Sequence, residues 1–327
     1  RSSDLVSQMA FPNVSDIVAT TIEKRSRKIA DNVTKNNALL TRLQQRGKSR
    51  PFSGGRLIYE ELSFAENGNA GFYSGYDLLP VAAQDVISAA QFDIKQAACP
   101  VVISGLEMLQ NAGPEQMIDL ISARIDVAES TMQNLICGGL YSDGLGYGGK
   151  QIVGLNAAIP TTPNTGVYGG IDRATWTFWR SKLVDVANTT TIQANMNTLW
   201  SSLVRGTDAP DLILMDNLTW AAYTASLQAQ QRFTDASVGN LGFPSLKYMG
   251  TDVVLDGGIG GFCPAGTAFF LNTKYIHYRP HSQRNFVSLS PNKRYSINQD
   301  AEVQILAWAG AMTMSGSQFQ GRLDTNP

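Results

Sequence analysis

The segment from Gly144 to Gln151 carries the most suggestive chemical motif in the chain, because its glycines fit two phosphate-binding patterns. It reads GLGYGGKQ, which satisfies both G-x-G-x-x-G and G-x-x-x-x-G-K, but Gln151 stands where a phosphate loop needs Ser or Thr for the metal. Both motifs require a strand before the loop and a helix N-terminus after it, since free helix N–H groups hold the anion. Here a helical pattern precedes the loop and an extended pattern, 151–155, follows it. We therefore predict a flexible turn and no nucleotide site.

Two further candidates for chemistry are a second glycine cluster and a histidine pair. Gly257–Gly261 follows a predicted strand but continues as loop through 263–266, so it also reads as a turn. His277 and His281 have the spacing of helical metal ligands, but Pro280 and β-prone neighbours argue against a helix there. With two histidines and no paired-carboxylate motif, a hydrolytic triad has little to be built from. We expect no metal, no cofactor and no enzymatic activity.

The three cysteines, Cys99, Cys137 and Cys263, are far apart and odd in number. They fit neither a disulfide framework nor a zinc-ligand pair. Buried, reduced thiols are the expectation, which suits a cytosolic origin.

Composition points towards extensive contact between subunits. Charged residues make up only 16% of the 327 residues and hydrophobic residues 43%. No apolar run approaches the roughly 18 residues needed to span a bilayer, so no membrane partner is expected. The N-terminus lacks the order of a secretory signal.

The first 50 residues are basic, with ten Lys and Arg against four Asp and Glu in a chain of net charge −1. Arg25, Arg27 and Lys28 lie at the centre of this segment. A solvated helix face is one interpretation. Contact with nucleic-acid phosphate or with an acidic neighbouring subunit is the other.

The pattern of residues 51–98 predicts a long β-hairpin arm. We expect the rest of the chain to support this arm. One leg, 57–64, places Ile58, Leu62 and Phe64 on one face at period two, with Glu60 as the exception, and the leg 86–95 would pair with it antiparallel. The tip between them is broken by glycines and carries apolar side chains, namely Phe72, Tyr73, Tyr76, Leu78 and Leu79. A two-stranded hairpin is marginal in water, and such a tip needs a cover. Either the arm folds back on its own domain or neighbouring copies cover it.

The remaining chain must support this arm. Two long helices are predicted, 14–45 ending at Gly47 and one from Pro114 to Gly138-Gly139, and either could be the central spine. An α/β module follows, with helices 192–204 and 216–230 and strands 212–215, 246–249 and 252–255. Strands then dominate at 268–271, 275–278, 286–289 and 303–311.

Several strings of residues resemble the major capsid proteins of tailed bacteriophages. They are Ser53–Leu62, Asp172–Trp176, Gln231–Thr234 and Ala301–Gly321, the last ending in GSQFQG, and the resemblance runs from about Phe11 onward. It implies an α+β fold of the Hong-Kong-97-like (Johnson) type. In that fold 1–50 would be an N-terminal arm, 51–98 the extended loop, 166–267 an α/β axial domain, and 99–165 with 268–327 the peripheral domain with its long spine helix.

The resemblance also implies a function. Copies would assemble into hexamers and pentamers of an icosahedral shell in the host bacterial cytoplasm, enclosing double-stranded DNA without sequence-specific binding, and the protein would reside in the virion. A decoration or cement protein, a portal and a scaffold are partners compatible with this role.

One departure from the family concerns covalent cross-linking, for which some members use a lysine on the extended loop. Between Pro51 and Ile94 this sequence has no lysine, and Lys95 sits at the base. We therefore predict non-covalent interlocking, by strand addition and by pairing of Glu60, Glu61 or Glu66 with basic residues of an adjacent subunit.

Two other functions remain open at this stage. An encapsulin-like compartment would use the same fold to enclose a cargo enzyme. An α/β nucleotide-binding enzyme would use the glycine-rich loops.

Overall fold

The computed structural model describes residues 38–110, 120–186, 190–227, 245–258, 260–289, 294–296 and 299–325. Arg25, Arg27 and Lys28 lie outside these residues, as does the predicted helix start at Pro114. The predicted N-terminal helix is described only as α2, Ala38–Gln45, and Gly47 with a φ of 65° ends it as expected.

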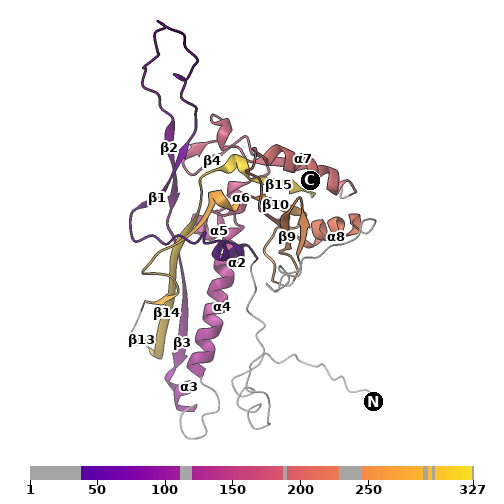
Figure 1. The fold of residues 1–327 in the computed structure, drawn as a ribbon. Coiled ribbons are helices and arrows are strands. Elements are labelled where there is room, and N and C mark those ends of the chain that lie inside the picture. The colour runs from indigo at the N-terminus through magenta and orange to yellow at the C-terminus, as the bar shows by residue number, and fades with distance from the viewer. Residues whose placement is uncertain are drawn as a thin grey trace.

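A sheet built around one long strand runs down one side of the molecule (Figure 1). β14 (Gln299–Met314) pairs with β3 (Lys95–Ser104) over ten residue pairs, from Ala301 opposite Ser104 to Gly310 opposite Lys95. β11 (Ile276–Pro280), β12 (Val287–Ser288) and β13 (Arg294–Ser296) also pair antiparallel with β14. The short helix α3 (Gly105–Gln110) follows β3.

The long helix α4 (Leu120–Leu140) lies beside this sheet (Figure 1). Ala128, Met132 and Ile136 are buried on one face of this helix, whereas Leu135 is 37% exposed. The predicted stop at Gly138-Gly139 is wrong.

Both of these glycines are helical, and their missing side chains let neighbouring groups pack closely on the helix. A Cβ on Gly139 would lie 3.1 Å from the side chain of Ile152, and one on Gly138 would lie 3.4 Å from the ring of Phe262.

The second sheet has six strands in the order β6-β15-β10-β7-β9-β8. These are β6 (Lys182–Asp185), β15 (Gly321–Asp324), β10 (Thr267–Leu271), β7 (Leu212–Met215), β9 (Thr251–Leu255) and β8 (Ser245–Tyr248). β7 runs parallel to β9, and β15 parallel to β6. The helices α7 (Ile192–Leu203) and α8 (Asn217–Ser226) complete the predicted α/β module (Figure 1).

Alternation along β7 explains how this sheet joins two cores. Ile213 and Met215 pack with apolar residues of α7 and α8, whereas Leu212 and Leu214 belong to the main core, which α4 shares. β10 and β15 belong to this sheet, so the predicted boundary at residue 267 separates two paired strands, β7 and β10. The strands on either side of this predicted boundary are thus hydrogen-bonded neighbours.

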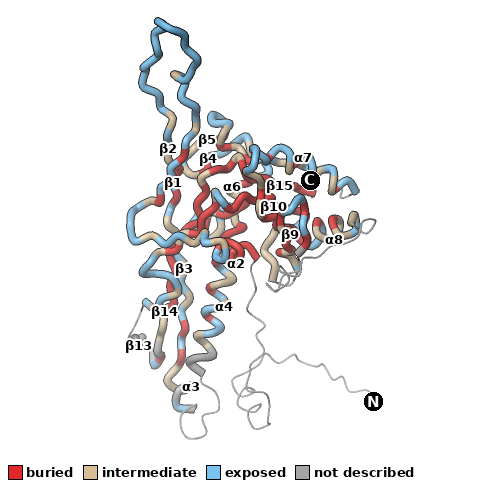
Figure 2. Tube along the Cα trace, viewed as in Figure 1, coloured by how far each residue is buried: buried red, intermediate tan, exposed pale blue. Residues whose placement is uncertain are grey.

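The predicted hairpin is confirmed. β1 (Leu57–Ser63) pairs antiparallel with β2 (Ile87–Asp93), with Leu57 opposite Asp93 and Ser63 opposite Ile87. Beside it lie the two-stranded β4 (Val167–Tyr168) and β5 (Ile171–Asp172). Figure 2 shows the buried residues concentrated in the body, with the distal part of the arm exposed.

The glycine-rich segment forms a turn and does not resemble a phosphate loop. α4 precedes it, a single helical turn α5 (Gly146–Gly149) contains Tyr147 at a φ of 55°, and α6 (Leu155–Ala158) begins where an extended segment was expected. The short 3-10 helices are η1 (Thr177–Trp179), η2 (Thr273–Tyr275) and η3 (Ser317–Phe319). His277 lies on strand β11, and the three cysteines are free thiols. Among the described helices, none has the length and apolar character to cross a bilayer.

Candidate assembly surface

The base of the arm is packed on its own chain. Ile58, Leu62, Ala90 and Phe92 share one face of the hairpin and are buried in the main core. The Phe92 ring meets the edge of Tyr168 on β4, with centroids 5.5 Å apart. The hairpin root is therefore part of the body, as the first of the two sequence-based alternatives required.

A buried ion pair fixes the same face. Arg279 on β11 donates from Nε to a carboxylate oxygen of Glu60 at 2.9 Å, and the hydroxyl of Thr313 on β14 donates to that oxygen at 2.7 Å. The Glu60 side chain is 9% exposed. Glu60 was expected to pair with a neighbouring subunit. That expectation is wrong, because the carboxylate is enclosed and its partners belong to its own chain.

Two further contacts hold the ends of the paired strands. Phe64, just after β1, packs against Trp176 and Phe178 with ring centroids 5.5 and 5.8 Å apart. At the start of β3, just after β2, the Lys95 ammonium donates to the Gly149 carbonyl at 2.9 Å. Lys95 is therefore occupied at the base of the arm, where the sequence placed it.

Beyond the paired strands, the tip is not packed on the body. Phe72, Tyr76 and Leu78 are each at least 98% exposed, and Tyr73 and Leu79 are also exposed. Two hydrogen bonds between residues three apart form local turns in the tip. The Ser74 N–H donates to the Asp77 carboxylate at 2.8 Å, and the Ala70 N–H donates to the Asn67 carbonyl at 3.1 Å. Figure 2 shows this segment exposed along its length. The arm thus combines a fixed root with an uncovered apolar end.

The exposed part of the arm is also acidic. Glu61, Glu66, Asp77 and Asp85 are exposed, and the sequence has no lysine or arginine from residue 57 to residue 94. A partner that covers this tip must therefore accept both apolar rings and negative charge.

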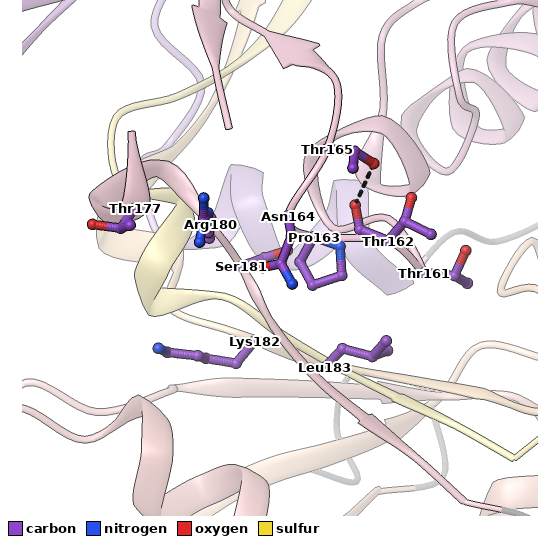
Figure 3. A pocket seen from close by; sticks show the side chains of 10 residues that line it. All are labelled: Thr161, Thr162, Pro163, Asn164, Thr165, Thr177, Arg180, Ser181, Lys182 and Leu183. Carbon is purple, nitrogen blue, oxygen red and sulfur yellow. Dashed lines mark hydrogen bonds between the residues drawn. The ribbon is translucent and has the colours of Figure 1, made fainter. Parts of the chain in front are cut away.

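A polar pocket of about 740 Å³ opens between two stretches of the body, 161–165 and 177–183. Figure 3 shows Arg180 and Lys182 towards one side of it and the threonines of 161–165 towards the other. Its lining contains two cations and no carboxylate; the lining residues are Thr161, Thr162, Pro163, Asn164, Thr165, Thr177, Arg180, Ser181, Lys182 and Leu183. This pocket could not be predicted from the sequence, because the two segments that line it come together only in the folded chain.

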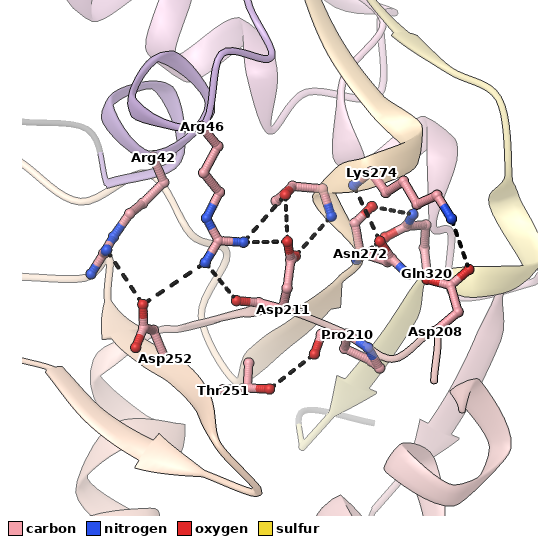
Figure 4. Close-up of polar contacts among 11 residues, drawn as sticks. Arg42, Arg46, Asp208, Pro210, Asp211, Thr251, Asp252, Asn272, Lys274 and Gln320 are labelled. Carbon is pink, nitrogen blue, oxygen red and sulfur yellow. Dashed lines mark hydrogen bonds and ion pairs between the residues drawn. The ribbon is translucent and has the colours of Figure 1, made fainter. Parts of the chain in front are cut away.

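Part of the basic N-terminal segment pairs within the chain (Figure 4). Arg42 on α2 lies 3.4 Å from the Asp252 carboxylate on β9, and Arg46 forms an ion pair with Asp211. Arg46 also donates to the Asp211 carbonyl at 2.9 Å. Burial lowers the pKa of Arg42, which the nearby Asp252 partly offsets. These two arginines therefore attach α2 to the six-stranded sheet and are not available to nucleic acid.

Cys137 is buried as expected, whereas Cys99 and Cys263 are partly exposed, and raised pKa values at Cys137 and Cys263 disfavour nucleophilic chemistry. Burial raises the pKa of Cys137 to about 12, and burial together with nearby Asp256 and Asp216 raises that of Cys263. A thiol must be deprotonated to attack or to bind metal. Within the described residues, no group of three or more His, Cys, Asp or Glu side chains is arranged to hold a metal ion.

Comparison with known proteins adds structural matches. No protein-family model and no curated protein sequence matches this chain. A chain of the cyanophage A-1(L) capsid asymmetric unit superposes with a TM-score of 0.74 at 17% identity, covering 96% of this chain and 99% of that one. The capsid of a native GTA particle gives a TM-score of 0.64 at 13% identity, covering 98% and 100%.

The chain has a capsid-protein fold. These matches confirm the Hong-Kong-97-like fold that the sequence resemblance implied, because they extend over nearly the whole of both chains. The holo-SrpI encapsulin of Synechococcus elongatus has the same architecture, with a TM-score of 0.56 at 9% identity and 95% coverage of each chain. The division into axial and peripheral domains and the contacts made by Glu61, Glu66 and the tip remain predictions.

Proposed function

We propose that this chain is the major capsid protein of a tailed double-stranded DNA bacteriophage. Many copies form hexamers and pentamers that close into the icosahedral head. The protein works by assembly in the host bacterial cytoplasm and remains in the virion, around DNA that it does not recognise by sequence. A scaffold, a portal and a decoration protein fit this role.

One observation carries the proposal: a rooted arm with an uncovered apolar tip, on a chain whose whole length follows a capsid fold. Phe72 and Leu78 are fully exposed to solvent. Such apolar side chains favour aggregation of a monomer, whereas at an interface between subunits they are buried and stabilise it. A closed shell reuses one surface in many copies, so each tip would find a neighbour.

The interlock between copies is non-covalent in this proposal. The exposed arm has no lysine, and the lysine at its root, Lys95, is held by the Gly149 carbonyl and by Asp93 at 3.8 Å. Particles boiled in detergent should therefore release single chains. Covalent multimers on that gel would contradict the non-covalent interlock.

Expression of the unaltered chain tests the proposal itself. Size-exclusion chromatography followed by negative-stain microscopy should show closed, uniform particles, and capsomers or sheets would support the same interfaces. A chain that stays monomeric at high concentration, with its arm exposed, would overturn the proposal.

The encapsulin match supports a second candidate, a cellular compartment that holds a protein cargo. The contents of particles purified from the native host separate the two functions. After nuclease treatment of the exterior, a phage head should retain protected double-stranded DNA, whereas a compartment should retain a co-purifying protein.

A further inference from the structure

The polar pocket between 161–165 and 177–183 has a lining whose charge is opposite to that of the arm. We propose that this pocket receives the tip of the arm from a second copy of this chain. The inference rests on the proposed function, since it specifies where one shell subunit binds the next.

Charge is the first argument. Two cations, Arg180 and Lys182, line the pocket without a carboxylate among the lining residues. Residues 57–94 carry five exposed carboxylates, from Glu61, Glu66, Asp77, Asp85 and Asp93, and no lysine or arginine. Opposite potentials on two surfaces favour their encounter and fix their register.

The position of the Arg180 guanidinium is set before any partner arrives. Its Nε donates to the Arg173 carbonyl and one terminal nitrogen to the Ala174 carbonyl, each at 2.7 Å. The pKa of Asp172 is lowered mainly by the hydrogen bonds that its oxygens accept from the Ala174 N–H and the Thr175 hydroxyl, and least by the charge of Arg180. The Arg180 charge is thus held in place by backbone carbonyls and faces no ion-pair partner in the lining. A preorganised cation of this kind binds a carboxylate at a low entropic cost.

The pocket wall also contains an unsatisfied group. Ser181 is 3% exposed, and its hydroxyl has no hydrogen-bond partner. A buried hydroxyl without a partner costs free energy that an incoming acceptor would recover. Pro163 and Leu183 add apolar surface to the same lining, which suits the rings of the tip.

Geometry requires the occupant to come from another molecule. The arm leads away from the body, and about ten residues per leg beyond the paired strands add roughly 33 Å of reach at about 3.3 Å each. The pocket lies in the body, and Gly169, which follows its 161–165 side in the chain, accepts a hydrogen bond from the Gln91 N–H at the arm's own root. A tip in a neighbour's pocket is a head-to-tail contact, which closes into a ring when the rotation between copies allows it.

Cysteine cross-linking tests the contact in assembled particles. Ser74→Cys places a thiol on the tip and Thr162→Cys one in the pocket, both at exposed positions. Oxidised particles of the double variant should give a ladder of cross-linked chains on a non-reducing gel, which reduction collapses to monomer. Ser74→Cys alone and Ser74→Cys with Thr198→Cys, an exposed position on α7, are the controls and should give no ladder.

A second measurement uses charge. Lys182→Glu should raise the protein concentration needed for assembly roughly two- to five-fold at low salt, with a smaller effect at high salt. Lys150→Glu, an exposed lysine outside the pocket, should leave it unchanged. Equal behaviour of the two variants would overturn the charge pairing.

The outcomes separate this inference from the proposed function. Particles that form without a ladder, or that cross-link to α7 instead, overturn the pocket as the receptor and leave the shell function standing. A chain that forms no assembly at all overturns both.

Discussion

Arg279 and Glu60 lie 219 residues apart in the chain, yet Nε of the arginine donates to the carboxylate of the glutamate at 2.9 Å in a largely buried setting. The pair joins the first strand of the arm to β11, and Thr313 of β14 completes the enclosure. The arm therefore leaves the body from a root that is fixed by charge and by packing. Its direction relative to the body is set before any neighbour binds.

Glu60→Ala should destabilise the subunit by about 3–5 kcal/mol, because it leaves the Arg279 guanidinium buried without its partner. Glu60→Gln keeps an acceptor and should cost less, about 1–3 kcal/mol. Urea unfolding of unassembled subunits, followed by tryptophan fluorescence, measures both. Glu61→Ala is the control, since Glu61 is the exposed neighbour on the same strand and should change stability by less than about 0.5 kcal/mol. Equal effects at residues 60 and 61 would contradict the buried pair.

Substitutions at the tip should show the opposite pattern. Phe72→Ser and Leu78→Ser should leave the free energy of unfolding within about 0.5 kcal/mol of the original, because both side chains are fully exposed in the single chain. Each should raise the concentration needed for assembly by at least about tenfold, since burying such a side chain is worth about 1.5–3 kcal/mol. Light scattering of assembly reactions gives this concentration. Leu145→Ser, at an exposed apolar residue on the body, is the matched control. A tip variant that assembles like the control would exclude the tip from the interface.

The local pattern of the sequence was sufficient to predict the hairpin, but not the ion pair between Glu60 and Arg279 that fixes its root. Period-two alternation in 57–64 and 86–95 predicted the paired strands, because each leg has one face to bury. Glu60 broke that alternation, and an acid on an apolar face signals a buried partner. Which of the 26 lysines and arginines supplies it depends on the pairing of β11 with β14, which no local pattern reveals.

The same limit explains why the make-up of the six-stranded sheet and the polar pocket could not be predicted from the sequence. β10 and β15 were recognisable as strands or as a family motif, but their membership of the six-stranded sheet comes from contacts with β7 and β6. Arg180 and Lys182 line one pocket with the threonines of 161–165 in the folded chain, although the two segments are separate in the sequence. The helix end predicted at Gly138 and Gly139 was wrong for a different reason. Glycines often end a helix, but these two lie inside α4, where the lack of a side chain lets Phe262 and Ile152 pack closely.

Close packing at the end of α4 gives a further prediction. A Cβ on Gly154 would lie 2.4 Å from the Leu140 carbonyl oxygen and 2.5 Å from that of Gly139, and backbone atoms cannot yield as a side chain can. Gly154→Ala should therefore destabilise the subunit by about 1–3 kcal/mol, as overpacking does. Gly71→Ala on the arm is the control, because no atom lies within 4 Å of its added Cβ, and it should cause no loss. Thermal unfolding of the two variants compares them, and equal midpoints would contradict the close contact.

His277 makes the stability of the body depend on pH. The residue is 4% exposed, and neither ring nitrogen has a hydrogen-bond partner. Its pKa is lowered from 6.5 to about 4, chiefly by burial and in part by the nearby charges of Arg50, Arg279 and Lys48, while Glu60 opposes the shift. The unfolded chain therefore binds a proton more readily than the folded chain between these two pH values.

Stability should consequently fall as the pH decreases from about 6.5 to about 4, by up to roughly 3 kcal/mol from this residue. Below about 4 both states are protonated, and the loss from this residue is complete. His277→Gln should remove this part of the slope, although carboxylates that titrate nearby will leave some pH dependence in both proteins. The measurement is the difference between the original chain and the variant in free energy of unfolding at pH 7, 5.5 and 4. A difference that stays constant across these values would show that His277 titrates alike in the folded and unfolded chains.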